Sequence, residues 1–196
     1  ITSRESQKYG HQLRAEYDAV LIGANTARLD NPRLTVRLAR GRNPKRVVLD
    51  ANFSSPLSCQ LFTDDLRTQT ILFTRRDGNE VVAKKKILLE QRGVRVVQME
   101  TDPNGMINLR QVLKRLGDEG IISLLVEGGQ HVFTEFLRQG LVDKAFIFIA
   151  PRVFGCSGLP AFRDLNALKH PEFLELSSFE AEKVGSDILI HGYIAK

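Results

Sequence analysis

The chain has 196 residues, about the length of one domain, and it is 42% hydrophobic and 26% charged. This average globular composition excludes a disordered tail, a collagen-like repeat and a small disulfide-bonded scaffold. The apolar runs are too short to span a bilayer, the start of the chain lacks a secretory pattern, and the net charge is only +5, so we expect a cytoplasmic protein without membrane contact.

Strand and helix patterns alternate along most of the chain. The first helix is expected to begin at Ser3, a typical N-cap residue. In chain order, the patterns predict a helix over Ser3–Tyr17, a strand over Ala19–Ile22, a short helix over Ala24–Leu29, strands over Arg46–Leu49 and Thr70–Thr74, a helix over Asn79–Arg92, a strand over Val94–Val97, a helix over Asn108–Glu119, a strand over Ile121–Val126, a helix around Val132–Leu137, a strand over Lys144–Ala150, and strands over Phe173–Glu182 and Asp187–Ile194.

This order is typical of an α/β protein. Continuous apolar strands such as Ile121–Val126 favour a parallel sheet covered by helices on both faces. The last two strands alternate in polarity and are joined through Val184–Ser186, which predicts an antiparallel pair at the edge of a mostly parallel sheet. No linker or repeat divides the chain, so we expect one domain over residues 1–196.

Two glycines mark the first candidate site. The predicted strand that ends at Val126 runs through Glu127 into Gly128 and Gly129, and a helix follows. Glycines allow the backbone to approach an oxygen-rich ligand, and a helix N-terminus offers free N–H groups. The pattern predicts a phosphate or pyrophosphate cradle, although a tight turn without ligand fits it equally well. Glu127 lies where α/β proteins bind ligands, or it makes a structural ion pair.

A second candidate site spans Gly23–Arg37. A strand ends in glycine, a short helix follows, and the sequence Asp-Asn-Pro stops that helix. Thr26 could bond a phosphate or ribose, Asp30 a hydroxyl or amide, and Arg37 could hold a phosphate through two hydrogen bonds. The alternatives are that Asp30 only makes a turn and that Arg14, on the first helix, is a solvated arginine.

The chain has few other groups for catalysis. Cys59 and Cys156 lack metal spacing, so we expect two free thiols. The scattered histidines predict no metal site. With 7% aromatic residues and no tryptophan, basic clusters such as Arg37–Arg46 indicate an anionic small molecule or a solvated surface rather than nucleic acid. A bound cofactor would suit this lack of nucleophiles.

The two sites together resemble a known family, the reductase domains of bacterial riboflavin-biosynthesis RibD proteins, which are 5-amino-6-(5-phosphoribosylamino)uracil reductases. The pattern Asp-Asn-Pro-x-Leu-Thr-x-Arg with a downstream Glu-Gly-Gly carries the resemblance. The matching stretches are Ile1–Ser3, Leu13–Ala15, Asp18–Gly23, Thr26–Arg37, Arg46–Asp50, Val126–Gly129, Leu141–Pro151 and Gly155. The resemblance implies a dihydrofolate-reductase-like fold.

The resemblance also implies a reaction, in which NADPH delivers hydride to the ribose C1′ of a ring-opened imine and gives the ribitylamino phosphate. The substrate contacts that it implies are Arg14, Leu34, Arg37 and Glu127. The cofactor contacts that it implies are Thr26, Asp30, Asp50, Gly128, Gly129, Gln130, His131, Val132, Phe133, Thr134 and Glu135. Ala51 stands where the family often has a hydroxyl residue. No residue is identified as the proton donor.

Further expectations concern the rest of the protein. Members of the family have a strand before the segment that matches Ile1–Ser3, and it lines the active site. In most bacteria a zinc deaminase domain precedes the reductase. We therefore expect this chain to be the C-terminal segment of a bifunctional protein, with the deaminase attached or cleaved off, and we expect a homodimer. The alternatives are a related pterin or pyrimidine reductase of the same fold, or a non-catalytic domain.

Overall fold

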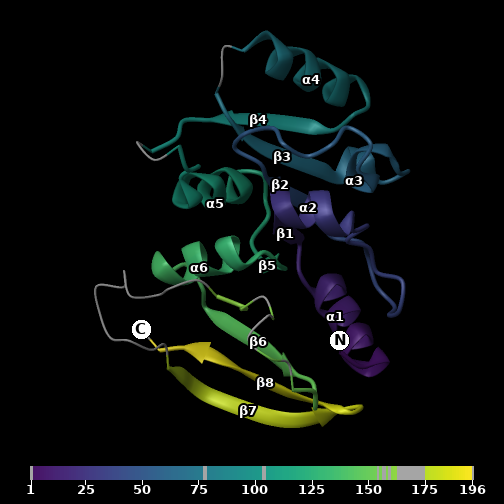
Figure 1. Cartoon of the computed structure of the whole chain (residues 1–196), viewed down its shortest axis with the longest axis vertical. Helices are drawn as coiled ribbons and strands as arrows, with labels where there is room; N and C mark the ends of the chain where they lie inside the picture. The colour runs from purple at the N-terminus through teal and green to yellow at the C-terminus, as the bar shows by residue number, and fades with distance from the viewer. Residues whose placement is uncertain are drawn as a thin grey trace.

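The computed structural model describes residues 2–76, 79–102, 105–153, 155, 158, 160–162 and 175–195 (Figure 1). Helices and strands alternate up to β6, and a strand pair follows. The elements are α1 (Arg4–Glu16), β1 (Ala19–Gly23), α2 (Ala24–Asp30), β2 (Lys45–Leu49), α3 (Gln60–Thr63), the 3₁₀ turn η1 (Arg67–Gln69), β3 (Thr70–Arg75), α4 (Glu80–Gln91), β4 (Arg95–Met99), α5 (Leu109–Gly117), β5 (Leu124–Val126), α6 (Gln130–Arg138), β6 (Lys144–Ile149), β7 (Leu176–Val184) and β8 (Asp187–Ile194).

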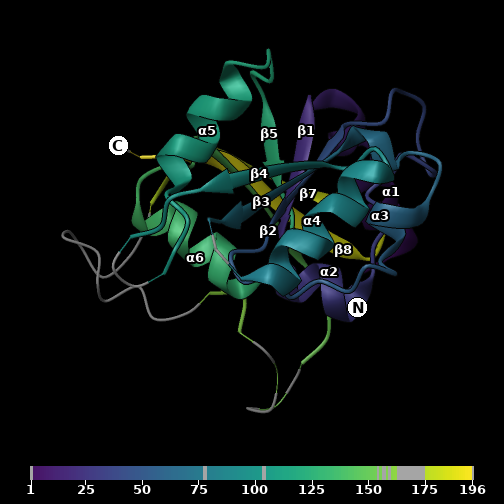
Figure 2. The same ribbon diagram turned by 90° about the horizontal axis from the view of Figure 1, so that it is seen from above.

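Five strands form the predicted parallel sheet, in the order β4-β3-β2-β1-β5. All five residues of β1 are buried, as its continuous apolar sequence predicts for a central strand. The sheet runs between helices in the view from above (Figure 2). Its strands are parallel, so all of their carboxyl ends lie along one edge.

Two apolar clusters cover the two faces of this sheet. On one face, α2, α3 and α4 contribute buried side chains such as Ala27, Phe62 and Leu89. On the other face, α5 and α6 contribute side chains such as Leu116 and Phe136. Side chains alternate between the faces of each strand, so a strand apolar at every position needs both layers of helices.

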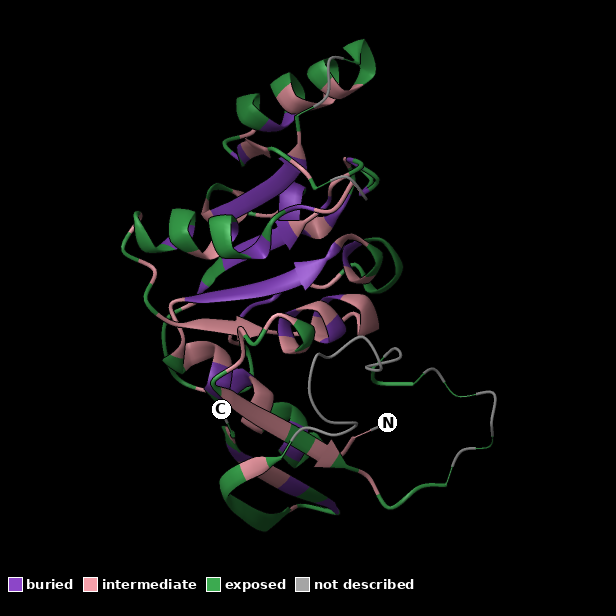
Figure 3. Ribbon diagram, turned by 90° about the vertical axis from the view of Figure 1, so that its left-hand side faces the viewer, coloured by how far each residue is buried: buried purple, intermediate pink, exposed green. Residues whose placement is uncertain are grey.

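The remaining strands form a second sheet, in the order β6-β8-β7. The predicted pair β7 and β8 is antiparallel, as expected, but β6 pairs antiparallel with β8 instead of joining the parallel strands. Phe173, the expected start of β7, lies outside the described residues. Figure 3 shows this sheet below the parallel one, with β6 less buried than β1.

Helix α1 is held against the second sheet by a buried carboxylate. Asp187, at the start of β8, accepts hydrogen bonds from the Ser3 N–H at 2.7 Å and the Ser6 hydroxyl at 2.6 Å. The Ser3 hydroxyl also accepts from the Ser6 N–H, which confirms Ser3 as the N-cap. Tyr9 packs edge-on against Phe148 of β6. These contacts fix the first half of α1 on the second sheet.

Two segments differ from the predicted elements. Strand β5 begins at Leu124 rather than Ile121, because the N–H groups of Ile122 and Ser123 donate to the side chain of Asp18 instead of to a neighbouring strand. Helix α3 and the turn η1 have four and three residues and were not predicted. Across the described ranges, no helix is long and apolar enough to cross a membrane.

Candidate active site

The order in which strands are added to the sheet reverses between the paired strands β1 and β5, and we call the region beyond the carboxyl ends of these two strands the crevice. From β1 the sheet grows through β2, β3 and β4 to one side, and β5 is added on the other. Helix α2 follows β1 and α6 follows β5, and they cover opposite faces. Open α/β sheets bind ligands at such a switch point, beyond the carboxyl ends of the strands. Both glycine segments predicted from the sequence reach this point.

Gly128 and Gly129 form the floor of the crevice. Their φ angles are +81° and +91°, a left-handed region that disfavours side chains. A Cβ at Gly129 would lie 3.3 Å from the Thr26 hydroxyl oxygen, and one at Gly128 would lie 3.5 Å from it. Thr26 comes from the first turn of α2. The structure therefore brings together the predicted cofactor contacts from the two segments.

Helix α6 begins directly after these two glycines. Gly129 is its N-cap and supplies no side-chain cap, so the first-turn N–H groups are left for another acceptor. The Val132 side chain packs in the core beside β1, where a Cβ on Gly23 would approach it to 2.7 Å, and it also lies 3.7 Å from the position of a Cβ on Gly129. A pyrophosphate fits this uncapped, side-chain-free surface, because it needs backbone donors and close approach.

The side chains of the later α6 residues that the resemblance implies as cofactor contacts bond or pack within the protein. The Thr134 side chain is buried and its hydroxyl donates to the Gln130 carbonyl at 2.7 Å. Glu135 forms an ion pair with Arg138 at 2.8 Å, and these hydrogen bonds lower the pKa of Glu135. The Phe133 ring packs near Phe162. Among the α6 residues implied as cofactor contacts, the first-turn backbone of Gln130, His131 and Val132 therefore fits best.

Arg14 and Glu127 form a two-bonded ion pair beside the cradle. Nε and Nη2 of Arg14 donate to the two carboxylate oxygens of Glu127, each at 2.6 Å. Nη1 of Arg14 donates to the Thr35 carbonyl at 3.2 Å. The two side chains are 17% and 25% exposed. Both were predicted as substrate contacts, and the structure joins them to each other, with Arg14 orienting the carboxylate.

The segment from Leu34 to Arg37 continues the site. Leu34 is buried and has φ +53°, a strained value for a residue with a side chain. Arg37 is exposed, and its Nη1 donates to the Thr35 hydroxyl at 2.7 Å. His11 was missed as a site residue, yet its Nδ1 accepts from the Arg37 N–H at 2.9 Å. The available signal was its position three residues before Arg14 on one helix face.

Two further predicted cofactor contacts, Asp50 and Asp30, follow β2 and end α2. Asp50 follows β2 and is buried, and its carboxylate accepts from the Ser54 N–H at 2.8 Å and the Ser55 N–H at 2.6 Å. It fixes the loop that follows β2. Asp30 is exposed at the end of α2, where Asn31 stops the helix with φ +42°.

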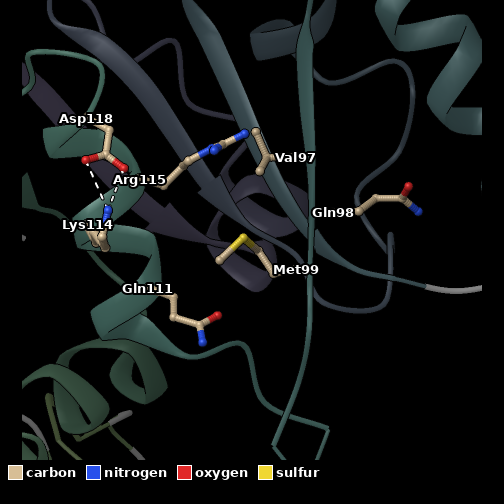
Figure 4. Close-up of a pocket in the computed structure, with 7 residues that line it drawn as sticks. All are labelled: Val97, Gln98, Met99, Gln111, Lys114, Arg115 and Asp118. Atoms are coloured by element: carbon tan, nitrogen blue, oxygen red, sulfur yellow. Dashed lines mark hydrogen bonds and ion pairs between the residues drawn. The ribbon is translucent and has the colours of Figure 1, made fainter.

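A separate hollow of about 310 Å³ lies between β4 and α5 (Figure 4). An ion pair at 2.9 Å between Lys114 and Asp118 lies on its α5 side. Its lining residues are Val97, Gln98, Met99, Gln111, Lys114, Arg115 and Asp118. None of the predicted site residues is among them, so this hollow is distinct from the crevice between β1 and β5.

Comparison with known proteins agrees with this geometry. The family described as the RibD C-terminal domain matches residues 1–190. This chain belongs to the RibD C-terminal domain family. The fold is therefore dihydrofolate-reductase-like, as the resemblance implied. No group of histidine, cysteine and acidic residues that could hold a metal occurs among the described residues of this family member.

Individual relatives of this RibD-type domain extend the comparison. The RibD protein of Aquifex aeolicus is 37% identical over 97% of the chain, which covers 50% of that relative. A 2,5-diamino-6-ribosylamino-4(3H)-pyrimidinone 5′-phosphate reductase of the same organism is 31% identical, with 87% of the chain and 75% of the relative covered. A Thermotoga maritima deaminase/reductase structure is 30% identical, with TM-score 0.74, 98% of the chain covered and 50% of that chain. The chain thus spans about half of the bacterial RibD proteins it matches.

Proposed function

We propose that this domain reduces the ribosyl group of 5-amino-6-(5-phosphoribosylamino)uracil to the ribitylamino phosphate, with NADPH as the reductant. The observation that carries the proposal is the joining of two features in one crevice. These are the side-chain-free Gly128–Gly129 floor beside Thr26 and the adjoining Arg14–Glu127 pair. The printed name of the Thermotoga maritima relative includes this uracil reductase activity, and the name of the pyrimidinone phosphate reductase supports reduction of a closely related ribosylamino substrate.

The cradle suits the pyrophosphate of a dinucleotide. Thr26, Gly128, Gly129 and the first turn of α6 would hold it, through backbone N–H groups and one hydroxyl. A dinucleotide held by these residues would supply, from its reduced nicotinamide, the hydride for the imine carbon. The chain itself would contribute binding and orientation through these residues.

Arg14 and Arg37 would have different roles in binding the substrate. All three donor positions that Arg14 uses are directed at Glu127 and Thr35, so we assign it to orienting Glu127. The oriented carboxylate would accept hydrogen bonds from donors on the pyrimidine. Arg37 is exposed and lies on the same side, so we assign it to the substrate phosphate.

The first experiment is a titration of NADPH against the wild-type chain and against Gly129→Ala, with NADH for comparison. The added methyl meets the Thr26 hydroxyl and an unfavourable φ, so we expect NADPH affinity to fall at least about tenfold. Gly120→Ala is the matched control. Gly120 also has positive φ, +78°, but a Cβ added there would meet no atom within 4 Å, and the residue is far from the cradle in sequence.

The second experiment is turnover of the phosphoribosylaminouracil substrate, followed as loss of reduced nicotinamide. Consumption of NADPH with formation of the ribitylamino product supports the proposal. NADPH binding without turnover of this substrate, but with turnover of a pterin, would favour the related reductases of the same fold. A folded chain that binds neither nucleotide would favour a non-catalytic domain.

We also propose that a further strand of the full protein lies between β5 and β6. Within the described part of the chain, β5 pairs only with β1 and β6 pairs only with β8. The apolar residues of β5 are only half-buried, unlike those of β1. Hydrogen exchange tests this idea. Amides of β5 and β6 should exchange more slowly in a longer form of the protein that carries the proposed strand than in this chain.

We propose a homodimer through the second sheet. Ile147 and Ile149 of β6 and Ile188 of β8 lie on one face, because Ile149 is paired directly with Ile188. They are 39%, 48% and 49% exposed, and a patch of large apolar side chains often marks an interface. Sedimentation of the wild-type chain and of Ile188→Lys checks this. We expect a dimer that dissociates in the variant, while a monomeric wild-type chain would contradict the proposal.

A further inference from the structure

His11 occupies a buried position behind the substrate side of the site. It lies in α1 one turn before Arg14 and is 6% exposed. Its Nδ1 accepts a hydrogen bond from the main-chain N–H of Arg37 at 2.9 Å. Only an unprotonated ring nitrogen can accept, so this contact requires a neutral imidazole that carries its hydrogen on Nε2.

The main chain of residues 35–37, which His11 contacts, makes three hydrogen bonds to side chains of other segments. The Thr35 carbonyl accepts from Arg14 at 3.2 Å, the Val36 N–H donates to the Asn43 side chain at 2.7 Å, and the Arg37 N–H donates to His11. A strained residue, Leu34 with φ +53°, starts the segment. Strained backbone persists only when its surroundings fix it. Of these three contacts, the one to His11 involves a group that titrates near neutral pH.

Burial, together with two nearby positive charges, favours the neutral form of His11. Burial lowers its pKa most, and the positive charges of Arg14 and Arg37 lower it further. Glu127 and a hydrogen bond to the Thr35 backbone act in the opposite direction. The two arginines that serve the substrate side therefore also protect the acceptor that positions one of them.

We propose that His11 is a positioning residue, whose neutral ring fixes the Arg37 main chain and whose protonation releases it and weakens binding of the phosphorylated substrate. This inference rests on the proposed function for its consequence in catalysis. The contact itself stands on the structure alone. A protonated Nδ1 would turn a second donor toward the Arg37 N–H, so the hydrogen bond is replaced by repulsion.

The first test needs no activity. Backbone amide and imidazole signals are followed by NMR against pH in the wild type and in His11→Asn, whose amide oxygen can replace Nδ1 as acceptor. We expect the Arg37 amide to shift with the same midpoint as His11, below the usual histidine value of about 6.5. That shift should vanish in the variant. An Arg37 amide that does not follow His11 would overturn the proposal.

The second test measures affinity for ribose 5-phosphate at pH 7.5 and 5.5, by the same NMR signals. Protonation of the ligand phosphate weakens binding in every variant, so His11→Asn supplies the reference. Wild type should lose several-fold more affinity at the lower pH than His11→Asn. Equal losses in the two proteins would overturn the proposal, and this holds whether or not the chain is a reductase.

The third test is kinetic. His11→Ala should raise KM for the phosphorylated substrate about tenfold, as expected for loss of one hydrogen bond, with kcat within twofold and KM for NADPH unchanged. His11→Asn should restore KM and remove the acid limb of kcat/KM. His191→Asn, in the second sheet, is the control and should match wild type. If the wild type does not turn over, the proposed function fails, and the two NMR tests still decide the role of His11.

Discussion

Removing the charge of Glu127 tests the ion pair that joins α1 to the end of β5. The wild-type pair has two charge-assisted hydrogen bonds of 2.6 Å between side chains 17% and 25% exposed. Hydrogen bonds to charged groups contribute about 1.5–3 kcal/mol each when well shielded. Glutamine keeps one acceptor and the site is partly solvated, so we expect Glu127→Gln to lower the free energy of unfolding by about 1–2 kcal/mol. For a domain of this length, that is a fall in Tm of about 2–8 °C.

The assay is urea unfolding of Glu127→Gln, Arg14→Gln and the double variant. If the two residues act through each other, the double variant should be less destabilised than the sum, with a coupling of about 1–2 kcal/mol. Glu135→Gln is the control, because Glu135 pairs with Arg138 three residues away on one helix, where a pair contributes about 0.5 kcal/mol. The reasoning is refuted if Glu127→Gln costs no more than Glu135→Gln, or if the Arg14 and Glu127 effects simply add.

Three further predictions concern stability and reactivity. Asp64→Asn should lower the free energy of unfolding in urea by about 2–3 kcal/mol, because it leaves the buried guanidinium of Arg46 without its charged partner. The same change at the exposed neighbour Asp65 should have little effect. Hydrogen bonds from a serine hydroxyl and a backbone N–H lower the pKa of Asp187. Its stabilising effect is therefore present above pH about 4 and lost as the pH falls through the lowered value, so the Tm difference between wild type and Asp187→Asn should shrink in acid. Burial raises the pKa of the Cys59 thiol, and in a Cys156→Ser background a thiol reagent should label it only as fast as the chain unfolds.

The fold could be predicted where local sequence and tertiary structure agree. Strand β1 is apolar at each position and ends in glycine, and the structure buries all of it. The start of β5 could not be predicted, because Ile121 has a suitable side chain but the next two N–H groups bond to Asp18, more than one hundred residues earlier. The partner of β6 was likewise set by a distant strand, β8.

In the candidate site too, features set by local sequence could be predicted, and contacts between distant residues could not. Gly128 and Gly129 were predicted as a cradle because a strand-glycine-helix pattern is local, and the structure gives both glycines positive φ. The pairing of Arg14 with Glu127 joins residues 113 positions apart, so the sequence offered each as a contact for substrate and neither as a partner for the other. The expected cofactor contact of Asp50 stays a prediction, and its carboxylate accepts hydrogen bonds from Ser54 and Ser55 in the loop that follows β2.

The hydrogen bonds from α1 to Asp187 have a consequence for biosynthesis. A ribosome releases the chain from its N-terminus, and the cofactor cradle needs only residues up to the end of α6, Arg138. The hydrogen bonds that fix the start of α1 need Asp187, 184 positions after Ser3. Contacts this distant in sequence form late. The nucleotide cradle should therefore be complete on the nascent chain well before the first turn of α1 is fixed to β8, whereas the contacts of His11 and Arg14 need no residue beyond Glu127.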